Sequence, residues 1–211
     1  MNIVLFGKPG AGKGTQAPRL AERLGVATLA TGDVLRAAVQ AGTALGREAK
    51  GYMDRGALVP DAVILGIVRE ALAAPGYARG AILDGVVRTV PQAEGMRGVM
   101  AGLGRRIDAV LDFDVANDEI VRRLSSRLVC AACQTPYMTG KVGDPCPKCG
   151  GVLVRRKDDE PEAIRHRLEV FEAQTAPVFE WYRAAGTPVA TVDATGPVDE
   201  VTARALKALG R

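Results

Sequence analysis

The chain has 211 residues, of which 28 are basic and 24 acidic, giving a net charge of +4, and 47% of its residues are hydrophobic. This length supplies one hydrophobic core with at most small insertions, and so small a charge gives no indication of a nucleic-acid partner. No apolar run of about 18 residues occurs, and the N-terminus lacks the pattern of a signal peptide, so we predict a cytoplasmic protein without a membrane-spanning helix.

Short apolar runs alternate with helical patterns along most of the chain. Strands are expected over 1–6, at the start of 26–33 before a polar turn, and over 80–85, 109–115 and 187–196. Helices are expected over 15–25, 62–74, 119–128, 160–186 with an interruption near Pro177, and 197–209. Strands separated by helices in this way indicate an α/β fold, in which helices cover both faces of a parallel sheet.

A glycine-rich segment stands between the first strand and the first helix. Residues 7–15 read GKPGAGKGT, so glycines let backbone N–H groups converge on a phosphate at a helix N-terminus, and Lys13 can reach the outer phosphates. The strict phosphate-loop pattern has Ser or Thr directly after the lysine, whereas here Gly14 precedes Thr15. We interpret the segment as a nucleoside triphosphate site; a chance glycine-rich turn is the alternative.

Two segments do not fit the simple alternation. Residues 31–59 are helical but longer than a crossover between strands needs, and residues 128–157 are rich in Gly, Pro and Cys. All four cysteines lie in the second segment as two CxxC pairs separated by twelve residues: Cys130, Cys133, Cys146 and Cys149. In a reducing compartment this spacing is typical of a zinc ion held by four thiolates. Redox-active or idle thiols are the alternatives.

Five short motifs together carry a family resemblance. They are GKPGAGKGTQ at 7–16, TGDVLR at 31–36, GALVPD at 56–61, DGVVRTVPQAE at 84–94 and RRKDD at 155–159. In their order and spacing, over essentially the whole chain, they resemble the adenylate kinase family, and the cysteines resemble the zinc-bearing LID of its long bacterial form. The resemblance implies a P-loop nucleoside monophosphate kinase fold, with a five-stranded parallel sheet covered by helices, an AMP-binding lobe and a zinc-ribbon-like LID.

The same resemblance implies a division of the chain and an activity. The CORE would comprise 1–29, 60–125 and 164–211, the AMP-binding lobe 30–59 and the LID 126–163. The activity would be reversible phosphoryl transfer from MgATP to AMP, giving two ADP. Mg²⁺ bound with ATP and a structural Zn²⁺ would be the cofactors. The partners would be ATP, AMP and ADP, without nucleic acid or membrane, and the chain would act as a monomer.

Residue roles follow from the resemblance at matching positions. The ATP-binding residues would be Gly10, Gly12, Lys13, Gly14, Thr15, Arg123 and Arg127. The AMP-binding residues would be Thr31, Arg36, Val59, Gly85, Arg88, Gln92, Arg156 and Arg167, with Gln92 at the adenine edge. The catalytic residues would be Lys13, Asp84, Arg88, Arg127, Arg156 and Arg167, where Asp84 holds water ligands of Mg²⁺. The metal ligands would be Cys130, Cys133, Cys146 and Cys149.

Three other readings stay open at this stage. Thr31 and Gln92 favour adenine over the pyrimidine of a UMP or CMP kinase. A nucleotide-binding relative with weakened catalysis is favoured only by Val86 and Val87, which stand where the family usually has Phe-Pro. A nucleic-acid-binding zinc ribbon lacks the clustered basic and aromatic residues that such binding needs.

The two valines generate the first prediction. Proline fixes φ and valine does not, and a displacement of Arg88 by about 1 Å would cost on the order of a hundredfold in rate. We expect an active but weakened enzyme, because Asp84, Gly85 and Arg88 keep their spacing. The double substitution Val86→Phe with Val87→Pro should raise turnover or lower the KM for AMP in steady-state assays. Unchanged values of both constants would contradict this expectation.

Overall fold

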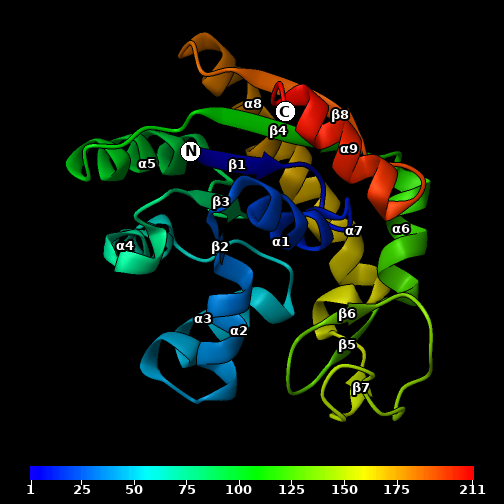
Figure 1. Cartoon of the computed structure of the whole chain (residues 1–211). Coiled ribbons are helices and arrows are strands. Elements are labelled where there is room, and N and C mark those ends of the chain that lie inside the picture. The colour runs from blue at the N-terminus through cyan, green and yellow to red at the C-terminus, as the bar shows by residue number, and fades with distance from the viewer.

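The computed structural model describes residues 1–211, and its centre is a five-stranded parallel sheet (Figure 1). The strands lie in the order β2-β3-β1-β4-β8, and every neighbouring pair is parallel. Their bounds are β1 Asn2–Phe6, β2 Ala27–Ala30, β3 Ala81–Asp84, β4 Ala109–Asp114 and β8 Val189–Asp193. The predicted sheet is therefore confirmed.

Helices cover both faces of this sheet, as the alternation predicted. They are α1 Lys13–Leu24, α4 Asp61–Ala73, α5 Val90–Gly102, α6 Asn117–Ser126, α7 Pro161–Val170, α8 Ala176–Ala184 and α9 Val198–Ala208. Alternate residues of β1 enter different cores: Ile3 and Leu5 pack on the side of α1 and α9, whereas Val4 and Phe6 pack on the side of α4, α5 and α8. Burying each such side chain contributes about 1.5–3 kcal/mol.

The order of the strands decides where a ligand can bind. From β1 the chain passes to β2 and β3 on one side of it and later to β4 on the other, so the connections leave β1 in opposite directions. In parallel sheets a crevice opens at this point, outside the carboxyl ends of the strands. The register pairs Leu5 of β1 with Asp84 of β3. Asp84 therefore stands beside the start of the glycine-rich loop.

Two further parts extend beyond the large sheet on the same side, as Figure 1 shows at the bottom of the view. One consists of α2, Thr31–Gln40, and α3, Ala44–Asp54, which pack so closely that a Cβ on Gly46 would lie 2.1 Å from the carbonyl oxygen of Ala38. The other is a three-stranded antiparallel sheet in the order β6-β5-β7, with bounds β5 Leu128–Cys130, β6 Pro136–Tyr137 and β7 Leu153–Val154.

Several boundaries differ from the predicted ones for local reasons. The expected polar turn after β2 is absent, because α2 begins directly at Thr31. Helix α5 was not among the expected elements, although Thr89 caps it by accepting a hydrogen bond from the Gln92 N–H. The expected interruption near Pro177 is a π-helical turn, Phe171–Thr175, where the Ala176 N–H bonds to the carbonyl of Phe171. Proline removes one helical hydrogen bond and displaces the preceding turn.

Short 3₁₀ turns complete the structure, at Pro75–Tyr77 and at Lys157–Asp159. No helix is long and apolar enough to cross a lipid bilayer.

Candidate functional site

The glycine-rich loop is built around Lys13 at the start of α1. Gly7, Gly10 and Gly12 all have positive φ, and a Cβ on Gly7 would lie 2.5 Å from the Phe113 carbonyl oxygen. Only glycine combines such backbone angles with so close an approach. The Lys13 ammonium donates to the carbonyls of Gly7, at 2.5 Å, and of Lys8, at 2.9 Å. The loop therefore curls around this ammonium and leaves the first N–H groups of α1 available to an anion.

Burial and opposite charge act against each other on Lys13 and Asp84. Burial lowers the pKa of Lys13 to about 8, and the negative charge of Asp84 partly offsets this effect. Burial likewise raises the pKa of Asp84, against the positive charges of Lys13 and Arg88. A Cβ on Gly14 would lie 3.5 Å from Asp84 Oδ2, so the carboxylate reaches the first turn of α1. The pair lies at the strand ends where phosphates and a cation can be bound.

Two adjoining cavities contain the predicted nucleotide-binding residues. The large cavity is lined by every predicted ATP-binding and catalytic residue: Gly10, Gly12, Lys13, Gly14, Thr15, Asp84, Arg88, Arg123, Arg127, Arg156 and Arg167. The small cavity is lined by seven of the eight predicted AMP-binding residues, namely Thr31, Arg36, Val59, Gly85, Arg88, Gln92 and Arg167. Arg156, the eighth, lines the large cavity instead. Arg36, Arg88 and Arg167 line both cavities.

Two aspartates hold the arginines around the cavities. Asp159, whose side chain is 3% exposed, accepts a bidentate pair from Arg127 at 2.8 and 2.6 Å and a bond from Arg167 at 3.1 Å. Asp158 forms a second ion pair with Arg167, also at 3.1 Å. Such bidentate pairs fix the guanidinium plane as well as its position. Asp158 and Asp159 therefore act as ion-pair partners that position Arg127 and Arg167.

The other arginines are compensated only in part: Arg36 forms an ion pair with Asp33, whereas Arg156 forms none. Burial, together with nearby Arg36 and Arg127, lowers the pKa of Arg156 to about 10. The Nε atoms of Arg36 and Arg156 are buried and have no hydrogen-bond partner within the protein. Buried donors of this kind are costly unless they find a partner. The arrangement therefore indicates an anion that binds between these arginines.

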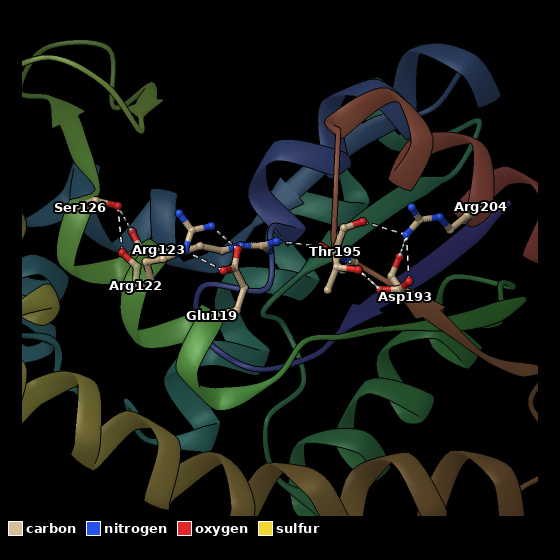
Figure 2. A network of polar contacts seen from close by, with 8 residues as sticks. Glu119, Arg122, Arg123, Ser126, Asp193, Thr195 and Arg204 are labelled. Carbon is tan, nitrogen blue, oxygen red and sulfur yellow. Dashed lines mark hydrogen bonds and ion pairs between the residues drawn. The ribbon is translucent and has the colours of Figure 1, made fainter.

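A polar network of residues on α6 lines part of the large cavity (Figure 2). Arg123 donates from Nε to Glu119, at 2.7 Å, and from Nη2 to the Ala194 carbonyl, at 3.0 Å. Arg122 binds the same carboxylate at 2.8 Å through two nitrogens. These two arginines lower the pKa of Glu119 to about 2. The guanidinium of Arg123 is thereby held between α6 and the loop after β8.

The four cysteines form a separate cluster in the small sheet. Their sulfur atoms all lie within 4.8 Å of one another, with Cys130 and Cys149 at 3.4 Å and Cys133 and Cys146 at 3.7 Å. A tetrahedral zinc ion with bonds of about 2.3 Å separates its sulfurs by about 3.8 Å. The donor set and its spacing therefore fit zinc, and none of the cysteines lines either cavity.

Comparison with known proteins agrees with this geometry. The family model described as adenylate kinase matches residues 5–187. The chain belongs to the adenylate kinase family. Relatives named adenylate kinase include those of Gemmatimonas aurantiaca, 61% identical, Geobacter sp. strain M21, 48% identical, and Methanothrix thermoacetophila, 44% identical. Each alignment covers at least 99% of this chain and 99% of the relative.

Some residues around the two cavities were not predicted from the sequence. The i,i+4 spacing of Glu119 and Arg123 is a detectable signal, since oppositely charged side chains four apart meet on a helix. The Ala194 carbonyl has no such signal, because any residue supplies a carbonyl and only the fold brings this one to Arg123. Gln134 and Met138 also line the large cavity.

Val86 and Val87, which replace the family's Phe-Pro, are buried at 0% and 3% exposure. Packing of both side chains in the core therefore holds the loop before Arg88, whose Nε donates to the Gly85 carbonyl at 3.2 Å. A phenylalanine adds volume to this closed core, which costs about 1–3 kcal/mol where the neighbours do not move. The melting temperature of the Val86→Phe, Val87→Pro variant should therefore be measured together with its kinetics, so that a loss of stability is not taken for a loss of activity.

The lowered pKa of Lys13 predicts a pH dependence of stability. Unfolding returns Lys13 to its ordinary pKa of 10.5, so between about pH 8 and this value the unfolded chain binds more protons. Stability contributed by this group therefore rises with pH across that window. Relative to Lys13→Met, the wild type should gain at most about 2 kcal/mol between about pH 7.5 and 9.5. Urea titrations of both proteins would show it, and a pH-independent difference would contradict it.

Proposed function

We propose that the chain transfers the terminal phosphoryl group of ATP to AMP, with ATP in the large cavity and AMP in the small one. The observation that carries the proposal is the junction of the two cavities. Seven residues line both: Gly32, Arg36, Gly56, Leu58, Gly85, Arg88 and Arg167. A phosphoryl group can pass from one nucleotide to the other only where their phosphates meet, and three arginines stand there.

The residue chemistry suits phosphoryl transfer. The moving group carries dispersed negative charge, and catalysis consists of alignment and charge stabilisation rather than covalent chemistry. Lys13 and the loop N–H groups would hold the donor phosphates, Arg36 and Arg88 the acceptor phosphate, and Arg127, Arg156 and Arg167 the group in transit. No histidine is needed, and the side chain of the only one, His166, is 47% exposed on α7.

Asp84 is the residue we assign to Mg²⁺, which enters together with ATP. Its carboxylate lies beside Gly14 at the start of α1, and burial has raised its pKa, so a cation close by stabilises its charged form. Oxygen donors of this kind, together with phosphate oxygens and water, are what Mg²⁺ prefers. When bound, the ion neutralises charge on the outer phosphates.

We further propose that the chain is divided into a CORE of 1–29, 60–125 and 164–211, an AMP-binding lobe of 30–59 and a LID of 126–163. The two lobes touch through few polar contacts, such as Lys157 with Asp54 at 4.0 Å. Loosely joined lobes can close over the nucleotides and exclude water, which would otherwise accept the phosphoryl group. We also propose that the protein is a monomer and is located in the cytoplasm.

Zinc is the metal that we propose for the cysteine cluster, in a structural role. Four thiolates leave no open position for chemistry. The LID has a core of only four buried residues, Leu128, Cys130, Cys146 and Leu153, which is too little apolar area to hold a fold without a further link. A metal ion bound by both CxxC pairs would link the two parts of the LID that carry them.

Metal analysis tests the zinc assignment directly. Protein purified under reducing conditions should contain about one zinc ion per chain, and Cys149→Ser should lower that content. Treatment with a strong chelator should lower the melting temperature, because metal binding and folding of the LID are linked. A zinc content far below one per chain in the wild type would refute the assignment.

The proposed reaction is tested by mixing the protein with MgATP and AMP and following ADP. Two ADP should form for each ATP consumed, and Lys13→Met should lower kcat on the order of a hundredfold or more. UMP and CMP as acceptors form the comparison panel, and a preference for either would identify a different nucleoside monophosphate kinase. ATP binding without transfer to any acceptor would identify a nucleotide-binding relative that lacks catalysis.

A further inference from the structure

The side chain of Gln92 is held at both ends within the wall of the small cavity. It is 1% exposed, and its Nε2 donates to Asp61 Oδ1 at 2.7 Å, while its Oε1 accepts from the Arg88 backbone N–H at 2.7 Å. The second oxygen of Asp61 accepts from Thr89 Oγ1 at 3.2 Å. Asp61 is the first residue of α4, and Thr89 caps α5. Two helix starts therefore fix one amide.

Chemistry allows only one orientation of this amide. An ionised carboxylate only accepts hydrogen bonds, so Asp61 must face the NH₂ group of Gln92. A backbone N–H only donates, so Arg88 must face the amide oxygen. Both neighbours require the same arrangement, and turning the amide over would place oxygen against carboxylate and NH₂ against N–H. Each end of the amide keeps one unused hydrogen-bonding position, a donor on Nε2 and an acceptor on Oε1.

This orientation matters because two purine types present opposite patterns. Adenine offers a donor at its 6-amino group and an acceptor at N1, whereas a 6-oxopurine offers an acceptor at O6 and a donor at N1. An amide fixed with its oxygen toward position 6 and its NH₂ toward position 1 pairs with adenine alone. The reversed amide would pair with the 6-oxopurine. A side chain that prevents the reversal therefore discriminates between the two bases.

We propose that Asp61 is a positioning residue that selects adenine over 6-oxopurines in the acceptor nucleotide, by locking the Gln92 amide. The inference rests on the proposed function, since it requires that the small cavity holds the acceptor base. Asp61 itself acts only through Gln92. Asparagine at position 61 keeps the shape but can donate as well as accept, so it removes one of the two constraints on the Gln92 amide and leaves only the Arg88 N–H to oppose its reversal.

The test compares binding of AMP with binding of IMP, whose base differs from adenine in this donor and acceptor pattern. Calorimetric Kd values should show that the wild type prefers AMP and that Asp61→Asn reduces the IMP-to-AMP ratio of Kd by roughly tenfold. Asp61→Glu retains a group that only accepts and should keep more of the preference. Should asparagine not be tolerated, Asp61→Ser provides a hydroxyl that also donates or accepts and gives the same comparison.

Asp118→Asn is the matched control, because Asp118 is an exposed aspartate in the first turn of α6. It loses the same charge at a helix start without a contact to Gln92, so its preference should equal that of the wild type. An unchanged preference in Asp61→Asn or Asp61→Ser overturns the inference. Because the readout is binding, wild-type protein that prefers AMP but forms no ADP would contradict the proposed reaction while leaving this comparison valid.

Discussion

The parallel pairing of β1 with β3 is the constraint on which the site depends. Its register sets Leu5 against Asp84, so the acid that ends one buried strand stands next to the loop that follows the other. Lys13 then lies close enough for the two charges to influence each other's pKa. A slip by one residue would turn the alternating side chains of a strand to the opposite faces, so core packing also enforces the register.

Concentrating positive charge at the site costs free energy. Arg36, Arg127, Arg156 and Arg167 come from separate segments, and burial lowers the pKa of two of them, Arg156 and Arg167. Asp158 and Asp159 offset part of this charge and fix the guanidinium planes, but buried Nε donors on Arg36 and Arg156 stay unpaired. Natural proteins tolerate such groups where a ligand completes them, and an anion such as phosphate would supply acceptors for these donors.

Positioning residues recur around both cavities. Glu119 holds Arg123 from four residues away on the same helix, whereas Asp61 holds Gln92 from a different helix. In each case an acceptor-only carboxylate fixes a side chain whose other polar atom meets a backbone group, the Ala194 carbonyl or the Arg88 N–H. Binding groups preset in this way lose less conformational freedom when a ligand arrives.

The sequence by itself determined the sheet, the glycine-rich loop before α1 and the family, because apolar periodicity and glycine requirements are local properties of the chain. No helix was predicted for the residues of α5, and the predicted helix over α6 extended beyond Ser126. Helix caps such as Thr89 and helix ends depend on only a few residues, so they leave a weak signal in the sequence. Only the tertiary structure decided that Arg156 lines the large cavity, that Asp159 pairs with Arg127, and that the Ala194 carbonyl meets Arg123. These contacts join residues up to 71 positions apart, and their distances arise from packing of whole elements rather than from any local pattern.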